Sequence, residues 1–458
     1  MVHQTSSLVF TVRRHPPELV APAIPTPHEI KLLSDIDDQN GLRYHLPLVC
    51  FYRYQHSMAG KDPVEVIRQA LAKTLVLYYP FAGRLRDGPN GKLWVDCTGE
   101  GVLFIEADAD VTLDYYGDNF MPPFPCFDEL LYNVPGSDGI INSPLLLIQV
   151  TRLKCGGFIF ALRFNHTMCD GSGICQFLKA MSEIAQGAPN PSILPVWQRD
   201  ILCARDPPRV TCIHHEYQQL PPDSRSIFIP HHRSFFFGPK EIASLHALLP
   251  RHLATKSTSF EVITACLWRC RTASLMWQNP NQEVRLLCIV NARFGNSCRS
   301  NSNPSLPNGF YGNAFVFPAA VTTVGKLLSH PLGYALELVR KAKSEANEEY
   351  VHSVTDLMAI KERPCFTMLG SFMVSDLTKS GCTDVNFGWG KASYSGVAKG
   401  GLGDFPGVSF YVPYTNSKGE TGRVIPICLP EDAMKRFEKE LDDTLKIKSN
   451  NAMLLSNL

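Results

Sequence analysis

One histidine and one aspartate stand four residues apart in the segment His166-Thr-Met-Cys-Asp170. An imidazole with an ordinary pKa near 6.5 can remove a proton from a hydroxyl at neutral pH, so His166 is a candidate general base. The spacing alone is a weak signal, because a core histidine beside a capping aspartate gives the same pattern. Its meaning therefore depends on the elements that surround the two residues.

The segments on either side of His166 predict a junction between a strand and a helix. Residues 145–151 and 158–164 are rich in β-forming residues, and the turn-forming stretch 152–157 between them indicates a hairpin. Beyond the hairpin, apolar residues recur at helical spacing behind Asp170, which occupies an N-cap position. His166 is thus expected where a strand ends and a helix begins, a place where α/β proteins build sites.

Helical periodicity recurs along the rest of the chain. It predicts helices over 63–77, 239–249, 259–274, 332–347 and 432–446. A buried strand is expected over 286–290, so the pattern as a whole is that of a mixed α/β protein. Because the region before residue 234 is rich in proline and shows little periodicity, we expect three parts in the chain. They are an N-terminal domain over 1–207, a crossover loop over 208–233 and a C-terminal domain over 234–458.

The composition is that of a globular protein without a strong overall charge. The chain has 458 residues, of which 45% are hydrophobic and 19% charged, and its formal net charge is +1. No strong field favours nucleic acid or an anionic membrane. The first residues lack the apolar stretch of a secretory signal, and Ser456-Asn457-Leu458 is not a peroxisomal address, so a cytoplasmic location is expected.

The fifteen cysteines are scattered singly, with no Cys-x-x-Cys pair. Buried free thiols are therefore expected, and no metal site. Serine hydrolase, zincin and P-loop motifs do not occur in the chain. The glycine cluster over 400–407 resembles a dinucleotide loop, but Pro406 replaces the last glycine and no strand-to-helix turn follows. We interpret it as a surface loop.

Several further motifs agree in order and spacing with one family. Besides His166 to Asp170, the chain contains Leu33-Ser-Asp-Ile-Asp37, Tyr79-Pro-Phe-Ala-Gly-Arg-Leu85, Val290-Asn-Ala-Arg293, Tyr311-Gly-Asn-Ala-Phe315, Asn386-Phe-Gly-Trp-Gly390 and Leu429-Pro430. With this series the chain resembles the plant BAHD acyltransferases over nearly its whole length. Within that family it is most similar to alcohol acyltransferases of the benzyl alcohol benzoyltransferase, methanol anthraniloyltransferase and fruit-ester type.

The resemblance implies two chloramphenicol-acetyltransferase-like domains, each a mixed sheet with flanking helices, joined by a long crossover loop. Acyl-CoA, a co-substrate and not a bound cofactor, would enter a channel between the domains from one side, and the alcohol from the other. His166 would take the hydroxyl proton as the alcohol attacks the thioester. Asp170 would point away from the channel and pair with Arg293, which makes its role structural.

The resemblance also assigns roles to residues outside the His166 segment. Asn386 stands where the family has aspartate, which places the local loop contacts in doubt. Trp389 is expected to be a packing residue, with a minority interpretation that it supports the oxyanion. Coenzyme A contacts fall on Lys256, Ser257, Thr258, Val290 and Asn291, although Ser257 or Thr258 could equally cap a helix. Ser34 to Asp37 would border the acceptor entrance, or form a turn.

Three functions remain open at this point. The first is an acyl-CoA-dependent alcohol O-acyltransferase, with a benzoyl, anthraniloyl, tigloyl or short aliphatic donor. The second is a catalytically idle relative that binds acyl-CoA or a protein partner. The third is a thioesterase that delivers the acyl group to water. Partners other than these small molecules are not indicated, and by resemblance a monomer is expected.

Overall fold

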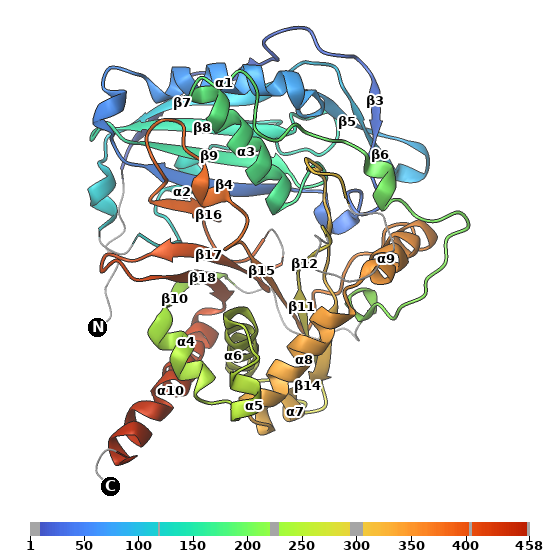
Figure 1. The fold of residues 1–458 in the computed structure, drawn as a ribbon, viewed down its shortest axis with the longest axis vertical. Helices are drawn as coiled ribbons and strands as arrows, with labels where there is room; N and C mark the ends of the chain where they lie inside the picture. The colour runs from blue at the N-terminus through green and yellow to red at the C-terminus, as the bar shows by residue number, and fades with distance from the viewer. Residues whose placement is uncertain (1–9, 118–119, 220–228, 294–305, 403–404, 456–458) are drawn as a thin grey trace.

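The computed structural model of the chain describes residues 10–117, 120–219, 229–293, 306–402 and 405–455. Its first large sheet has seven strands in the order β1-β7-β8-β9-β4-β16, with β2 also paired to β7 (Figure 1). These strands are β1 Val12–Arg14, β2 Glu18–Val20, β4 His45–Tyr52, β7 Val102–Ala109, β8 Leu146–Leu153, β9 Phe158–Asn165 and β16 Tyr394–Gly396. The predicted hairpin is β8 and β9, which pair antiparallel.

The second large sheet has six strands in the order β10-β18-β17-β15-β11-β14, and β11, β15 and β17 run parallel to one another. Its strands are β10 His231–Phe237, β11 Glu283–Cys288, β14 Ala319–Thr323, β15 Ser371–Asp376, β17 Val408–Thr415 and β18 Thr421–Leu429. Two small sheets complete the set: β3 Ile30–Leu32, β5 Arg84–Asp87 and β6 Leu93–Asp96 form one, and β12 Val290–Asn291 and β13 Phe315–Val316 form the other.

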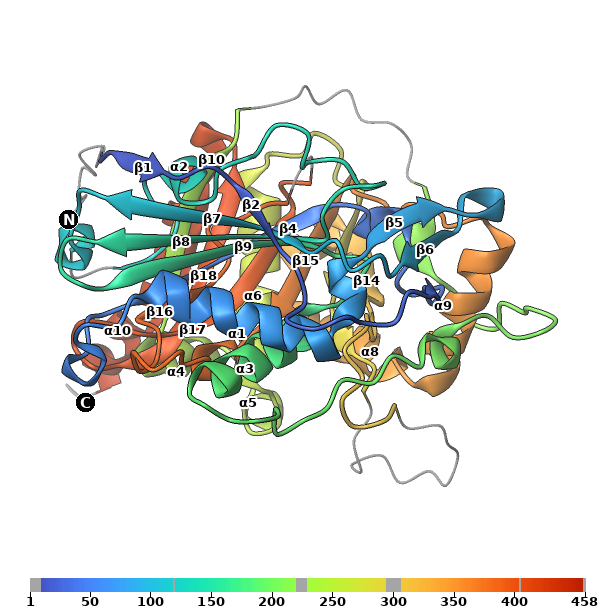
Figure 2. The same cartoon turned by 90° about the horizontal axis from the view of Figure 1, so that it is seen from above.

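The α-helices are α1 Pro63–Leu77, α2 Phe127–Leu130, α3 Gly171–Ala185, α4 Pro239–His246, α5 Arg251–Ala254, α6 Ser259–Ser274, α7 Val324–Ser329, α8 Leu332–Glu345, α9 Glu348–Ile360 and α10 Glu431–Leu455. Helix α1 packs on the first large sheet, with α3 beside it, and α4, α6, α8 and α10 pack on the second, whereas α9 lies to one side (Figures 1 and 2). The predicted bounds coincide with those of α1 and α6. Helix α4 ends three residues earlier than predicted, because the chain tightens into shorter-range bonds before Pro250.

The six-stranded sheet is buried on both faces. Along β17, Phe410 and Val412 join the core shared with the first sheet, whereas Tyr411 between them joins the core beneath α6 and α10. On β11, Leu287 faces the first core, and its neighbours Leu286 and Cys288 face the second. Successive side chains of a strand point to opposite faces, so such strands have continuous apolar sequences. The shared core fixes one sheet against the other.

One strand and one covalent bond connect the two halves of the chain. Strand β16 belongs by sequence to the second half, yet it pairs antiparallel with β4 at the edge of the first sheet, with Tyr394 opposite Phe51. Cys175 of α3 and Cys382 form a disulfide across 207 residues of sequence. The expectation that the cysteines are free is wrong for this pair, because the fold brings distant segments together.

Other expectations meet the described residues only in part. Residues 220–228 of the predicted crossover, 403–404 of the glycine cluster and the terminal Ser456-Asn457-Leu458 lie outside the described residues. Within the described ranges, no helix combines the length and the apolar character needed to cross a membrane. In the same ranges, no three or more His, Cys, Asp or Glu side chains are grouped as metal ligands would be.

Candidate active site

His166 directly follows the last residue of β9. Its backbone N–H donates to the carbonyl oxygen of Tyr44 at 2.9 Å, which continues the ladder that pairs Asn165 with His45. The chain then turns, and α3 begins at Gly171. The strand-to-helix junction expected from the sequence is therefore present. The histidine itself is only 9% exposed.

The surroundings of His166 favour a neutral imidazole. Burial lowers the pKa of His166 below its ordinary value of 6.5, because it removes water from the charged form. Hydrogen bonds to its own backbone and to Asn313, with the charges of Asp170 and Asp37, oppose this shift without reversing it. The ring is thus in the form that can accept a proton at neutral pH.

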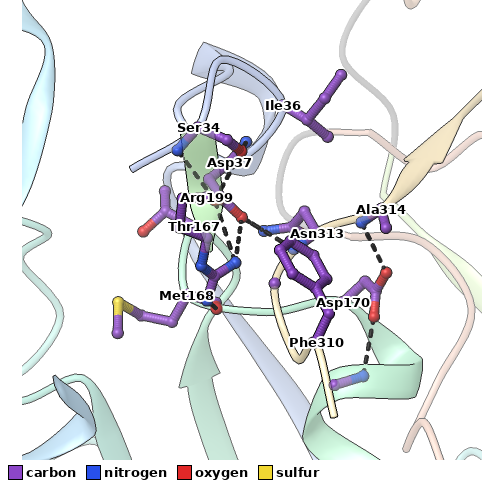
Figure 3. Close-up of polar contacts among 12 residues, drawn as sticks. Ser34, Ile36, Asp37, Thr167, Met168, Asp170, Arg199, Phe310, Asn313 and Ala314 are labelled. Carbon is purple, nitrogen blue, oxygen red and sulfur yellow. Dashed lines mark hydrogen bonds and ion pairs between the residues drawn. The ribbon is translucent and has the colours of Figure 1, made fainter. Parts of the chain in front are cut away.

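A buried polar network, of which Figure 3 labels Asp37, Arg199 and Asn313, contacts Nδ1 of His166. His166 Nδ1 is 3.1 Å from Asn313 Oδ1, and Asn313 Nδ2 donates to Asp37 Oδ1 and to the His166 carbonyl, both at 2.8 Å. Asp37 in turn accepts from Arg199 Nη1 at 2.9 Å. Asp37, Asn313 and Arg199 have exposures of 0%, 0% and 2%. Three segments that are far apart in the sequence thus meet on the Nδ1 side of the His166 ring.

Asp170 points into the contact between the two halves of the chain. Arg293 donates to both of its carboxylate oxygens, at 2.7 and 3.0 Å, and the backbone N–H groups of Gly173 and Ala314 donate to them as well. Burial alone would raise the pKa of Asp170, but Arg293 and these hydrogen bonds outweigh it and hold the pKa below 3.8. The carboxylate is fully engaged, and it caps α3.

Three aromatic side chains lie next to the His166 ring. The rings of Tyr44, Phe164 and Phe315 have centroids 5.5, 5.7 and 6.0 Å from the imidazole. Phe315 leads in turn to Phe317, at 6.2 Å, and that ring continues the series through Phe366 to Phe405. The base therefore lies at one end of a row of flat apolar surfaces.

The motif Asn386-Phe-Gly-Trp-Gly390 forms a loop that the side chain of Asn386 holds together through hydrogen bonds. Its side-chain oxygen accepts from the backbone N–H groups of Gly388 and Gly390, at 2.9 and 2.8 Å. Both glycines have positive φ, 111° and 79°, which side chains other than glycine rarely adopt. A carboxamide oxygen accepts these bonds as a carboxylate would. The replacement of aspartate thus leaves the loop's internal contacts satisfied.

The minority interpretation of Trp389 as an oxyanion donor is not compatible with its position. Trp389 is 2% exposed and packs edge-on against Phe158, with ring centroids 5.2 Å apart. Phe158 begins β9 and His166 follows its end, eight residues later, which at about 3.3 Å per residue is roughly 26 Å. Trp389 is a packing residue at the far end of the strand.

The positions assigned to coenzyme A lie on two elements. Thr258 is the N-cap of α6, where it forms a capping box with Glu261. Lys256 is exposed, and Ser257 lies 3.3 Å from a ring nitrogen of His246. Val290 and Asn291 form β12.

Ser34 to Asp37 do not border an entrance. Ser34, Ile36 and Asp37 are all 0% exposed, and Ser34 donates to Asp37 through both its N–H and its hydroxyl. The expected turn is present, and its aspartate is directed toward Asn313 and Arg199. We did not predict from the sequence that Asp37, Asn313 and Arg199 would lie together. Asp37 and Asn313 lie within motifs quoted for the family resemblance, which was the available signal.

Comparison with known sequences places this site in a family. The model described as "Transferase family" matches residues 10–444. A benzyl alcohol O-benzoyltransferase of Petunia hybrida is 62% identical over 448 residues, which cover 97% of this chain and 95% of that protein. The chain belongs to the Transferase family, that of the BAHD acyltransferases. The family resemblance inferred from the motifs is confirmed.

Other members of the family differ in the groups that their names state. A 13-hydroxylupanine O-tigloyltransferase of Lupinus albus is 62% identical, and the alignment covers 100% of each chain. An alcohol acyl transferase 1 of Malus domestica is 52% identical over 95% of each chain. The prediction of an O-acyltransferase is confirmed by this set of relatives, which spans aromatic and branched acyl groups.

Solved structures support the fold. Vinorine synthase matches with a TM-score of 0.69 at 21% identity, over 93% of this chain and 96% of that one. TRI101 of F. graminearum, solved with ethyl coenzyme A, matches with a TM-score of 0.72 at 16% identity, over 90% and 97%. The expected fold of two chloramphenicol-acetyltransferase-like domains is confirmed.

Proposed function

We propose that this chain transfers the acyl group of an acyl-CoA to an alcohol, and that His166 is the general base. The observation that carries the proposal is a buried, neutral histidine in a chain of the acyltransferase family. The histidine lies where the two halves of the chain meet, which we call the seam and which contains the Asp170–Arg293 ion pair. Nδ1 is occupied by Asn313, and among the described residues Nε2 has no hydrogen-bond partner. Nε2 is therefore the atom that meets the alcohol.

The chemistry requires few groups from the protein. Nε2 accepts the hydroxyl proton while the alcohol oxygen attacks the thioester carbonyl, and a tetrahedral oxyanion forms. The C–S bond then breaks, and the imidazolium returns the proton to the departing thiolate. The products are an ester and free coenzyme A. Asp170 does not take part in proton transfer, because its four hydrogen bonds hold it against Arg293 and α3.

The row of aromatic rings beside His166 favours a flat substrate. Tyr44 and Phe315 offer stacking or edge contacts to an aromatic group, which are worth about 0.5–1.5 kcal/mol beyond burial. We therefore propose a benzoyl-type donor or a benzyl-type alcohol as the preferred substrate. For coenzyme A we retain Lys256, Ser257, Thr258, Val290 and Asn291 as proposed contacts, and a cytoplasmic monomer as the proposed state.

The deciding experiment measures thiol release and product mass together. Purified protein is incubated with benzoyl-, anthraniloyl-, tigloyl- and acetyl-CoA, with and without benzyl alcohol, methanol and hexanol. We expect alcohol-dependent thiol release and an ester of matching mass, with benzoyl-CoA turned over most efficiently. Thiol release without alcohol would indicate a thioesterase. Binding of acyl-CoA without any release would indicate an idle relative.

A further inference from the structure

The hydrogen bond between His166 and Asn313 leaves one question open when taken alone. A histidine nitrogen can donate or accept, and the two ends of an amide are interchangeable in shape. The 3.1 Å contact is compatible with Nδ1–H donating to the amide oxygen, or with an amide N–H donating to Nδ1. Only the first arrangement leaves Nε2 able to accept a proton.

The other contacts of Asn313 remove the ambiguity. Its Nδ2 lies 2.8 Å from Asp37 Oδ1 and 2.8 Å from the His166 carbonyl oxygen, and both partners can only accept. A flipped amide would place its oxygen against these two oxygens, where burial makes each lost hydrogen bond costly. The amide oxygen must therefore face Nδ1, and Nδ1 must carry the proton.

The carboxylate of Asp37 can only accept, and donors surround it. Arg199 Nη1 lies 2.9 and 3.1 Å from its two oxygens, and the backbone N–H of Asn313 donates to Oδ1 at 2.9 Å. Ser34 supplies two further donors. An arginine keeps its charge across the pH range of proteins, so the carboxylate has a permanent partner. The donors thus converge on Asp37: the imidazole donates to Asn313, and Asn313 and Arg199 both donate to the carboxylate.

Arg199 also holds the turn that carries the base. Its Nη2 donates to the carbonyl oxygen of Met168 at 2.8 Å, two residues after His166. The guanidinium fits only because residue 312 is glycine, since a Cβ there would lie 1.5 Å from Nη1. One buried cation thus orients both Asp37 and the backbone beside His166.

We infer that Asp37 and Asn313 are positioning residues that hold His166 in the Nδ1–H tautomer, and that Arg199 keeps Asp37 ionised and in place. We call these three residues, Asn313, Asp37 and Arg199, the relay. The inference rests on the proposed function, in which Nε2 of His166 accepts the proton of the alcohol. The relay makes the histidine a base in one defined direction, toward the side of the ring that Asn313 does not occupy.

The direct test is the tautomer of the resting enzyme. Protein labelled with ¹⁵N-histidine is examined by NMR above the pKa of His166, and the signals of His166 are assigned by their loss in His166→Gln. We expect the proton on Nδ1. A proton on Nε2 in the wild type would overturn the inference, and this measurement requires no destabilised variant.

Variants separate positioning from simple support of the fold. Asn313→Ala should weaken the preference for the Nδ1–H form, because only the bond of the ring to its own backbone remains, and lower kcat by up to about tenfold with the KM for acyl-CoA unchanged. Full kcat in Asn313→Ala with an unchanged tautomer would contradict the relay.

A distant asparagine provides the matched control. The side chain of Asn386 accepts two backbone hydrogen bonds, and it belongs to the loop at the far end of β9. Asn386→Ala should lower the melting temperature without changing the tautomer or the pH profile. If the wild type transfers no acyl group in the substrate panel, the proposed function fails. The tautomer of the resting protein still decides the inference separately.

Discussion

The ionisation of His166 sets how the enzyme responds to acid. Because burial lowers its pKa, the neutral base persists below pH 6.5 and is lost only as the pH falls through the lowered value. We expect kcat/KM to be level near neutral pH and to decrease with an acid limb whose midpoint is below 6.5. A pH–rate profile of the wild type checks this, and a midpoint above 6.5 would contradict the neutral, buried base.

Removal of the base should leave a folded and nearly inactive protein. His166→Gln keeps a polar side chain but cannot accept the proton, so we expect kcat to decrease by about 10²- to 10⁴-fold. Circular dichroism and the melting temperature verify that the fold is intact. Turnover close to that of the wild type in a folded His166→Gln protein would exclude His166 as the base.

Asp170 should contribute to stability more than to chemistry. Asp170→Ala leaves Arg293 partly buried without its partner, and we expect a loss of roughly 3–5 kcal/mol in the free energy of unfolding. Since its folded pKa is lowered, the stabilisation is present above the unfolded pKa and disappears as the pH falls through the folded value, below 3.8. Denaturant melts at several pH values measure both effects.

The control for Asp170 is an exposed ion pair elsewhere in the chain. Asp384 lies 2.8 Å from Lys391, but both side chains are more than half exposed. Asp384→Ala should leave the unfolding transition where it is, because exposed pairs contribute little. Total loss of activity in Asp170→Ala with an unchanged melt would instead favour a direct catalytic role.

At the N-terminus of α6, Thr258 has two proposed roles, as the helix cap and as a contact to coenzyme A, and substitutions can separate them. Thr258→Ala removes the capping box of α6, so we expect a loss of about 1 kcal/mol in unfolding free energy, which Thr258→Ser should restore. If the hydroxyl also contacts coenzyme A, the KM for acyl-CoA rises in the alanine variant and recovers in the serine variant. An unchanged KM would remove Thr258 from the coenzyme A site.

The elements also differ in how far the sequence determines them. Helices α1 and α6 were predicted with correct bounds because local signals define their ends, such as Asp62 with Pro63 and the Thr258 capping box. The relay behind His166 was not predicted, because Asp37, Arg199 and Asn313 are far apart in the chain. No local pattern distinguishes a turn-forming aspartate from one that receives an arginine in the folded core.

In the whole molecule, the disulfide between Cys175 and Cys382 adds a covalent link to the seam. A link that closes so long a loop typically stabilises by 2–4 kcal/mol, so Cys382→Ser should unfold at lower denaturant in the absence of a reductant. Addition of a thiol reductant should bring the wild type to the same midpoint. Cys365→Ser, at an exposed free cysteine, is the control and should not change either melt.

Intact mass with thiol alkylation tests the bond directly. The unreduced wild type should leave Cys175 and Cys382 unmodified and alkylate only after reduction and unfolding. Alkylation of both cysteines in unfolded, unreduced protein would show that the bond is absent. Sequence reasoning expected free thiols, since neither cysteine shows a local signal of its distant partner.

Strand β16 has a consequence for the recombination of relatives. Chimeras of two relatives are a natural way to study substrate range in such enzymes. The simplest design joins the N-terminal half of one parent to the C-terminal half of the other in the loop between them. Such a joint separates β16 from the strand β4 that it pairs with, so a hybrid would combine an edge strand from one parent with a sheet from the other. Hybrids that exchange residues 394–396 together with the first half preserve the native register. They are the ones we expect to express as folded protein.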